Sequence, residues 1–437
     1  MPATAVKGRR GRAFSLTPEV RRRLRRLVGI GFLLVVGAFL LVRTPGVWEY
    51  RLRHMDADTL ALLALERPGD ALVFYYLGTS LYNEGRFREA AAMLERALQL
   101  KPRFPRAALA LGLTYMAGRR PLQAHEVLQR ALEMAPNSPE AHFALGMLYL
   151  YQFEGAQPRA AEQFQAVCRL QPWNAEAWYY YGLCQEAMGF YPAAIEAFQR
   201  ALRLRPFSVR ALRELGFVLT DDKKYGEAAL ALQKALELEP EDPYSHYLMA
   251  HLALQRSSKP EDLALAEREA KRALELGFVG IEPFALLGEV AFRRQEYGRA
   301  KHFHELCLRL MPRAADSLYR LALIHQRLNQ PEKAKEYMER YARLREVTSA
   351  IQNTIDRIKM RPEDLDLRLR LARLFVQDGD YARAINQYEY YLSHRPQDEG
   401  ARRELEALRQ KFGALASSLR LPSSLQEEPL LYPSSQP

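Results

Sequence analysis

The stretch Ala175–Ser208, AEAWYYYGLCQEAMGFYPAAIEAFQRALRLRPFS, contains two helical patterns in succession. Gly182 belongs to the first pattern. In the second pattern Ala194 and Phe198 are four residues apart, so they share one helix face. Pro206 ends the second helix. Neither helix can bury its apolar face alone, which predicts that further copies of the hairpin pack beside it.

The marker residues of this hairpin recur over most of the chain, and most copies are 34 residues apart. Small residues occupy the Gly182 position in the other copies, namely Gly78, Gly112, Gly146, Gly216, Gly288, Ala250, Ala322 and Ala372. Alanine recurs at the Ala194 position, and proline closes most copies. The small residues are expected where the helices approach one another most closely.

This pattern resembles the tetratricopeptide repeat, in which Trp, Leu-Gly, Tyr, Ala, Phe, Ala and Pro stand at fixed positions. Trp178 and the pairs that begin at Leu77, Leu111, Leu145 and Leu215 match it. The resemblance implies an all-α fold, a right-handed superhelical α-solenoid of about nine hairpins. The hairpins are expected at residues 71–104, 105–138, 139–174, 175–208, 209–242, 243–280, 281–314, 315–348 and 365–398.

The second helix of the eighth hairpin is expected to be unusually long, near residues 331–361, because no proline ends it. Apolar residues along it form a heptad seam: Tyr337, Tyr341, Leu344, Thr348, Ile351, Ile355 and Ile358. One interpretation is that the seam packs on the ninth hairpin. The alternative is self-association, or docking of a partner, through Tyr337, Leu344, Ile351, Ile355 and Ile358.

The N-terminal region combines a basic tail with an apolar segment. Residues 1–26 hold nine Lys/Arg and one Glu, and residues 27–42 are sixteen uncharged, almost wholly apolar residues. Residues 27–43 are therefore predicted to form an uncleaved transmembrane signal-anchor helix, with a cytoplasmic tail and an extracytoplasmic or periplasmic solenoid at the inner membrane. A cleaved signal peptide and a buried soluble helix are the alternatives.

The remaining ends of the chain are expected to cap the solenoid. Residues 47–70 are predicted to contain a linker and an N-terminal capping helix, and residues 399–412 a C-terminal capping helix. Residues 413–437 are rich in Ser and Pro and are expected to be disordered.

Charge and cysteine content exclude several classes of protein. The basic tail contributes +8 of the net charge of +11, so the other residues carry only +3, and no nucleic-acid partner is expected. Cys168, Cys184 and Cys307 form no CxxC pair. His304 and Cys307 fall on core positions of their hairpin, so no metal site is predicted. No catalytic motif and no cofactor-binding motif is present, and no enzyme activity is expected.

In the tetratricopeptide family the first helix of each hairpin lines a concave groove, through its second, fifth, ninth, twelfth and thirteenth positions. Transferred by position, the resemblance implies these partner-binding residues: Tyr75, Thr79, Tyr82, Leu109, Leu113, Met116, Phe143, Met147, Tyr179, Leu183, Glu186, Arg213, Phe217, Tyr247 and Tyr319. The family's carboxylate clamp for acidic peptide ends needs basic and amide groups, but apolar residues such as Leu113 and Met147 stand there. The aromatic and apolar surface instead favours an apolar helix or an extended peptide.

Together these features predict a membrane-tethered scaffold that binds a partner peptide or helix. An envelope assembly, secretion or polysaccharide-related complex is the expected setting. The first alternative is a non-catalytic accessory subunit of a membrane-associated enzyme. The second is a soluble cytoplasmic adaptor, which would apply if residues 27–42 do not insert into a membrane.

Overall fold

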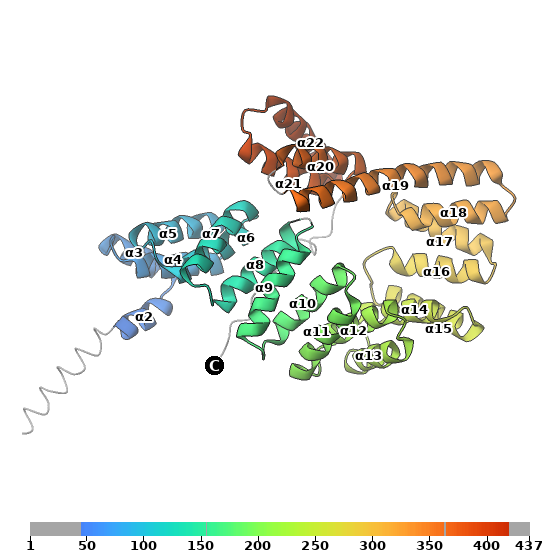
Figure 1. Cartoon of the computed structure of the whole chain (residues 1–437), viewed down its shortest axis with the longest axis horizontal. Helices are drawn as coiled ribbons and strands as arrows, with labels where there is room; N and C mark the ends of the chain where they lie inside the picture. Colours follow the sequence, from blue (N-terminus) through green and yellow to red (C-terminus); the bar gives the residue numbers. More distant parts are fainter. Residues whose placement is uncertain (1–44, 154, 362–363, 419–437) are drawn as a thin grey trace, which may run out of the picture. The chain divides into compact units, whose positions relative to one another are not determined.

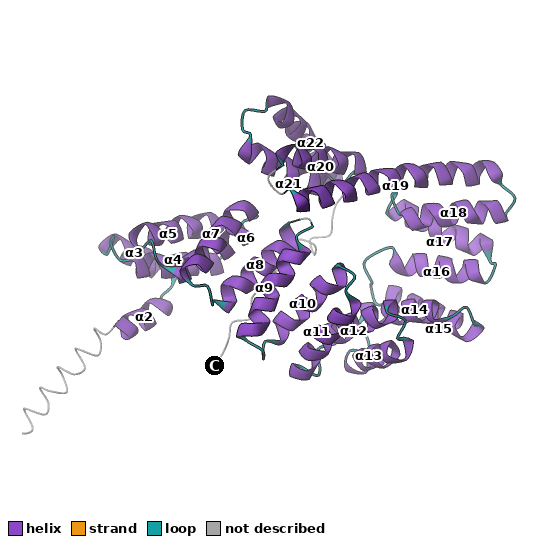
Figure 2. Cartoon of the chain, viewed as in Figure 1, coloured by secondary structure: helices purple, strands orange, loops and turns teal. Residues whose placement is uncertain are grey.

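The computed structural model describes residues 45–153, 155–361 and 364–418, and every regular element in these ranges is a helix (Figure 2). The helices are α2 (Pro45–Arg53), α3 (Ala57–Glu66), α4 (Ala71–Asn83), α5 (Phe87–Leu100), α6 (Pro105–Ala117), α7 (Pro121–Met134), α8 (Pro139–Gln152), α9 (Gln157–Leu170), α10 (Ala175–Ala187), α11 (Tyr191–Leu204), α12 (Val209–Asp221), α13 (Tyr225–Leu238), α14 (Pro243–Arg256), α15 (Pro260–Glu275), α16 (Glu282–Arg293), α17 (Tyr297–Leu310), α18 (Ala315–Arg327), α19 (Pro331–Met360), α20 (Leu365–Asp378), α21 (Tyr381–His394) and α22 (Glu399–Ser418). The expected all-helical solenoid of hairpins is confirmed.

The predicted transmembrane segment, residues 27–43, lies outside the described residues. Within the described ranges, no helix combines the length and the apolar character that a membrane crossing needs. The basic tail at residues 1–26 and residues 419–437 also lie outside them.

The chain divides into two compact units, residues 1–114 and residues 115–437. In the first unit α4 and α5 form a hairpin, and α2 and α3 pack on α4. Leu52 of α2 is fully buried in their shared core. The Tyr76 hydroxyl on α4 donates a hydrogen bond of 2.8 Å to the Glu49 carboxylate on α2. Helix α2 is thereby fixed to the first hairpin.

The second unit repeats one packing scheme from α8 to α19 (Figure 1). Each first helix packs on its own second helix, and that second helix packs on the next first helix, as in the series α10, α11, α12, α13. Side-chain N-caps begin several first helices: the Asn174 and Ser208 oxygens accept hydrogen bonds from the amides of Ala177 and Ala211, at 3.1 and 3.4 Å.

Within a hairpin, the small residue of the first helix faces a large side chain of the second. A Cβ atom built on Gly182 would lie 2.7 Å from the Phe198 ring, and one on Gly216 would lie 2.5 Å from Leu232. Such distances are too short for carbon atoms in van der Waals contact. The expected close approach at the Gly182 position is therefore observed, and it limits this position to the smallest residues.

The long helix expected near residues 331–361 is α19, and Figure 1 shows it as one continuous helix beside α18 and α20. Its N-terminal half packs on α18, where the Tyr337 ring stacks on His325 at a centroid distance of 5.3 Å. Its C-terminal half packs on the ninth hairpin, with Ile355 and Ile358 buried in a core shared with α20 and α21. One helix thus supports two successive hairpins.

Self-association through the α19 seam is not supported. Ile355 and Ile358 are only 8% and 5% exposed, and Ile351 packs against the same core. Tyr337 is engaged with His325, and Leu344 is half-buried. Tyr337, Ile355 and Ile358 meet intramolecular partners, as does Ile351, so little of the seam remains for a second copy.

The C-terminal helix is longer than predicted, because α22 extends to Ser418. The sequence interpretation placed its end at Phe412 and disorder from Gly413 onward. Gly413 does not stop the helix because Ala414, Leu415 and Ala416, all strong helix formers, follow it.

Candidate partner-binding groove

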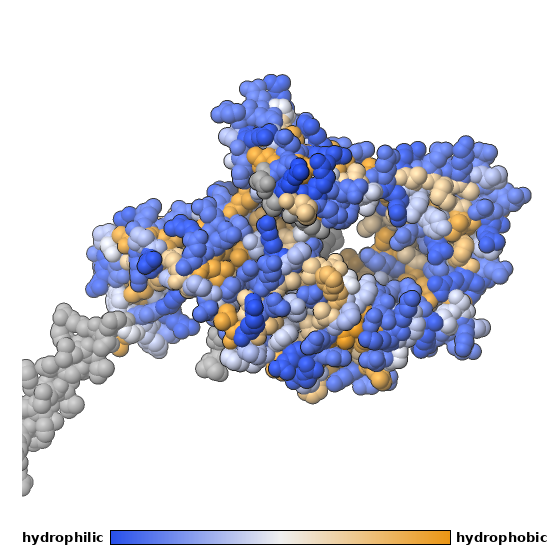
Figure 3. All heavy atoms as spheres, in the orientation of Figure 1, coloured by the Kyte–Doolittle hydropathy of each residue, from blue (hydrophilic) through white to orange (hydrophobic). Residues whose placement is uncertain are grey.

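The first helices of successive hairpins lie side by side in the second unit, where α12 contacts both α10 and α14, and α14 contacts α16. Residues at equivalent positions of these helices therefore form one continuous face. Hydrophobic and hydrophilic side chains alternate in patches over α10 to α12 (Figure 3). Six of the fifteen residues that the sequence predicted to bind a partner lie on α10, α12 and α14 of this face.

In the first unit, the predicted residues Tyr75, Thr79, Tyr82, Leu109 and Leu113 are all half-buried. The Tyr75 ring lies 5.2 Å from Phe104, and the Arg106 guanidinium lies 5.1 Å from its centroid. Part of this aromatic and aliphatic surface thus remains open on α4 and α6.

Three predicted residues of the second unit are mainly structural, since Met116, Phe143 and Tyr179 are only 6%, 7% and 8% exposed. The Phe143 ring makes edge contacts with Phe164 and Tyr180, at centroid distances of 5.4 and 5.6 Å. Tyr179 belongs to the core cluster that surrounds Phe198. The prediction that these side chains chiefly face a partner is wrong, because they fill the space between neighbouring hairpins.

The other predicted residues keep accessible surface. Met147, Leu183, Glu186, Arg213, Phe217 and Tyr247 are half-buried, and Tyr319 is exposed. These side chains combine partial exposure with fixed positions on packed helices, which suits contact with a ligand.

Arg213 is half-buried because it fixes the start of the next first helix. Its guanidinium lies 3.2 Å from a carboxylate oxygen of Asp242, the N-cap residue of α14. Asp242 also accepts a hydrogen bond of 2.8 Å from the Ser245 amide. Arg213 therefore acts on the stability of the groove more than on its surface.

Replacing Asp242 with alanine should lower the free energy of unfolding by about 2 kcal/mol, because α14 loses its cap and the Arg213 guanidinium loses its partner. The matched variant Ser138→Ala removes the N-cap of α8, which has no such cation, and should cost about 1 kcal/mol. Urea titration followed by circular dichroism measures both. Equal losses would show that the Arg213 ion pair adds nothing.

The centre of the face is acidic, with Glu186 on α10 and Glu214 and Asp221 on α12. Burial, reinforced by the charges of Glu214 and Asp221, raises the pKa of Glu186 to about 8. Burial also raises the pKa of Glu214 and of Asp221. His251 on α14 completes the cluster, and burial lowers its pKa although Asp221 partly opposes this.

Of this cluster, only Glu186 belongs to the set of partner-binding residues predicted from the sequence. Asp221 stands at the thirteenth position of its helix, one of the groove positions of the family, and His251 stands at a ninth position. Glu214 is at a sixth position, which the positional rule does not include.

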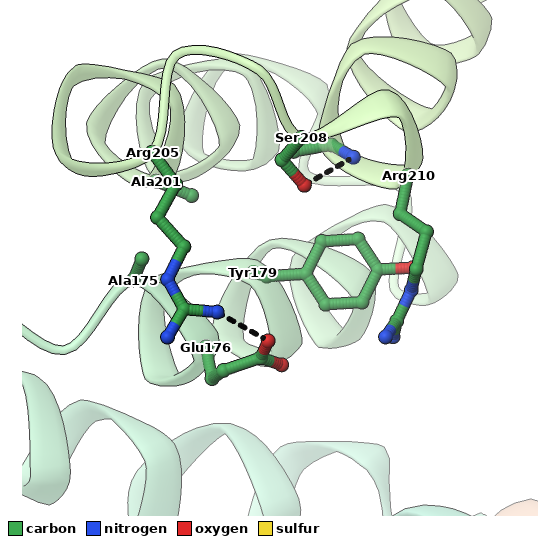
Figure 4. Close-up of a pocket in the computed structure, with 8 residues that line it drawn as sticks. Ala175, Glu176, Tyr179, Ala201, Arg205, Ser208 and Arg210 are labelled. Carbon is green, nitrogen blue, oxygen red and sulfur yellow. Dashed lines mark hydrogen bonds and ion pairs between the residues drawn. The ribbon is translucent and has the colours of Figure 1, made fainter. Parts of the chain in front are cut away.

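A small cavity of about 50 Å³ lies between α10, the end of α11 and the start of α12 (Figure 4). An ion pair between Arg205 and Glu176, at 3.1 Å, borders it, and the Tyr179 ring points across it toward Arg210. The volume is close to that of one or two water molecules. This cavity is too small for an extended peptide segment.

The histidine and cysteine residues considered for metal binding have structural positions. His304 and Cys307 are 2% and 0% exposed, as their core positions predicted, and His302 is exposed. Cys168 and Cys184 are buried free thiols, and burial raises the pKa of each to about 12. Thiols held in this protonated form are unreactive.

The architecture defines the class of helical-hairpin repeat solenoids. Family models described as tetratricopeptide repeat match residues 81–148, 157–209 together with 185–246, and 315–348. The chain therefore contains tetratricopeptide repeats. Proteins built from this repeat bind protein or peptide partners and are generally non-catalytic adaptors.

Solved structures with similar hairpin arrays are known, whereas no curated protein matches the chain. The crystal structure of MamA is 28% identical and covers 38% of this chain and 95% of its own, with a TM-score of 0.36. Pseudomonas aeruginosa pilF is 24% identical, with coverage of 49% and 94% and a TM-score of 0.41. YrrB, titled a TPR protein with an unusual peptide-binding site, is 19% identical, with coverage of 43% and 96% and a TM-score of 0.39.

Proposed function

We propose that this protein is a membrane-tethered interaction scaffold that holds a peptide or helix of a partner protein on the first-helix face. Its setting is an extracytoplasmic envelope complex, and it contributes no chemistry of its own. The anchor keeps the scaffold at one membrane surface, which raises the effective concentration of the partners that it binds there.

The observation that carries the proposal is the half-buried apolar and aromatic face on α10, α12 and α14. Leu183, Phe217 and Tyr247 each keep accessible surface while packed at the edge of a core cluster. Side chains that are fixed in place lose little entropy when a ligand covers them. A contiguous surface of this kind suits a bound peptide or helix.

The tether is supported by the sequence, and the packing of α2 indicates which unit it would hold. Residues 27–42 are long and apolar enough to insert with flanking arginines, and only two residues separate Val42 from the start of α2 at Pro45. Helix α2 is fixed to the first hairpin through Glu49 and Tyr76. A segment inserted before α2 would therefore hold the first unit close to the membrane.

Membrane fractionation tests the tether. The full chain should stay in the membrane pellet after a carbonate wash, and a variant without residues 27–42 should move to the supernatant. Release of the full chain by carbonate would contradict the anchor but would leave partner binding on the groove intact.

Replacing Phe217 with alanine should weaken partner binding at least tenfold, because a half-buried ring at the centre of the face is lost. The partner is first identified by affinity capture and mass spectrometry from solubilised membranes, and its affinity is then measured by calorimetry. Leu230→Ala is the matched control, since Leu230 is 69% exposed on the second helix α13. Equal affinities of the two variants would place the partner outside the groove.

A further inference from the structure

The acidic centre of the groove lacks a cation. Glu186, Glu214 and Asp221 form no ion pair with any described residue. The Glu186 Oε2 atom is buried and has no hydrogen-bond partner, and the same is true of His251 Nδ1. Buried polar atoms in folded proteins are nearly always hydrogen-bonded. Two buried atoms without a hydrogen-bond partner on one face therefore require an explanation.

The nearest arginines are already engaged. Arg213 is paired with Asp242 at 3.2 Å. The Arg210 guanidinium lies over the Tyr179 ring, 4.6 Å from its centroid. Both arginines lower the pKa of Glu214, but burial outweighs them and the net shift is upward. The chain's own cations therefore leave this cluster under-neutralised.

Aromatic surface flanks the carboxylates on the next helices. The Phe217 ring lies 6.0 Å from the His251 ring, and the Tyr247 ring lies 5.0 Å from Phe278. Phe217 and Tyr247 are both half-buried. An acidic centre beside aromatic walls, spread over three successive helices, matches an extended ligand with a cationic side chain between apolar neighbours.

Crowded carboxylates without a paired cation destabilise the free protein, because burial desolvates all three and Glu214 and Asp221 also repel Glu186. A ligand cation placed among these carboxylates would offset the desolvation cost and the repulsion. It would also donate a hydrogen bond to the Glu186 Oε2 atom, which has no partner in the free protein. Neutralising substitutions should thus weaken binding without destabilising the fold.

We propose that the α10–α12–α14 face binds an extended segment of a partner protein through a lysine or arginine side chain seated among Glu186, Glu214 and Asp221, with apolar neighbours against Phe217 and Tyr247. This inference rests on the proposed function and specifies the chemistry of the partner.

A random octapeptide display library selected on the detergent-solubilised full chain tests the inference. Selected peptides should be enriched in arginine or lysine next to apolar residues, and selection on the Glu186→Gln, Asp221→Asn variant should lose that enrichment. Failure to enrich basic residues, enrichment of acidic ones, or the absence of binders would overturn the inference.

A second experiment removes the charge of the peptide and that of the groove, separately and together, and so tests whether the two charges interact. The best peptide and a copy with citrulline in place of arginine keep the same shape but differ in charge. The citrulline copy should bind the native chain at least tenfold more weakly than the arginine peptide and should show little difference on Glu186→Gln. The control variant Glu196→Gln neutralises an exposed carboxylate on the second helix α11 and should retain the full difference.

Two outcomes separate this inference from the proposed function. If Phe217→Ala abolishes partner binding while the citrulline copy binds as well as the arginine peptide, the scaffold function stands and a cationic partner is refuted. If the citrulline copy binds the native chain much more weakly while Phe217→Ala binds the selected peptide as well as the native chain does, the cationic contact stands and the apolar contact of the proposed function is refuted.

Discussion

Replacing Phe198 with alanine is expected to lower the opening free energy of the fourth hairpin by about 4 kcal/mol. The Phe198 ring is fully buried and occupies the centre of the core cluster between α10 and α12. Its removal leaves a cavity that the packed helices cannot close. Native-state hydrogen exchange should show the loss in the amides of α10 and α11, whereas amides of the distant helices α20 and α21 serve as the internal reference.

The partner of this ring supplies the control. A Cβ atom on Gly182 would approach the Phe198 ring to 2.7 Å, so Gly182→Ala alone should cost about 2 kcal/mol through overpacking. In the Phe198→Ala background the new methyl group enters the cavity, and its cost should vanish. The sixth hairpin already contains such a combination, because Ala250 and Ala270 share one core cluster. Simple additivity of the two substitutions would contradict the close approach as the reason for glycine.

The fold was predictable because one steric requirement is repeated. Most hairpins place a small residue opposite a large one, so a 34-residue spacing of residues such as Gly182 and Ala194 reveals the helices and their order. The absence of a proline likewise predicted the length of α19. The end of α22 was missed because a single glycine at Gly413 is a weak stop signal when strong helix formers follow it.

The groove was less predictable, because a position in the repeat specifies the side of the helix on which a side chain lies but not how much of that side chain is exposed. Tyr179 and Tyr247 stand at the same repeat position. Tyr179 is buried because the Arg210 guanidinium and Phe198 cover it, whereas Tyr247 keeps open surface. Which neighbours cover a ring depends on side chains from adjacent hairpins, and periodicity does not encode this. The acidic cluster was missed in part because Glu214 stands at a sixth position, which the positional rule does not include.

Acidification should destabilise the seventh hairpin through His304, by about 3 kcal/mol between pH 7.5 and pH 4. Burial, together with the positive charge of Arg320, lowers the pKa of His304 from its usual 6.5 to about 4. The folded state thus holds the neutral imidazole, while the unfolded chain takes up a proton near pH 6.5. The stability is fully present above pH 6.5 and is lost as the pH falls toward 4.

The structure explains why this imidazole resists protonation. Its Nδ1 atom lies 3.2 Å from the Ser317 hydroxyl, and its Nε2 atom is buried against Gly288 without a hydrogen-bond partner. A proton on both nitrogens would place a positive charge in a site that offers no anion among the groups that face it. His304 occupies the position that Phe198 holds in the fourth hairpin, so phenylalanine fits the same geometry opposite a glycine.

The variant His304→Phe should therefore lose about 3 kcal/mol less than the native chain over this pH range, as measured by urea titrations at pH 7.5 and pH 4. Comparing the two proteins is necessary because other groups also have different pKa values in the folded and the unfolded chain: lysine and arginine partners lower the pKa of Glu267 from 4.5 to about 2, whereas burial raises that of Glu186 from 4.5 to about 8. These contributions are common to both proteins and cancel in the difference. His302→Gln, which removes an exposed imidazole, should behave like the native chain. If all three proteins lost the same free energy of unfolding between pH 7.5 and pH 4, His304 would be protonated in the folded state as readily as in water. The buried Nε2 atom without a hydrogen-bond partner would then have no energetic consequence.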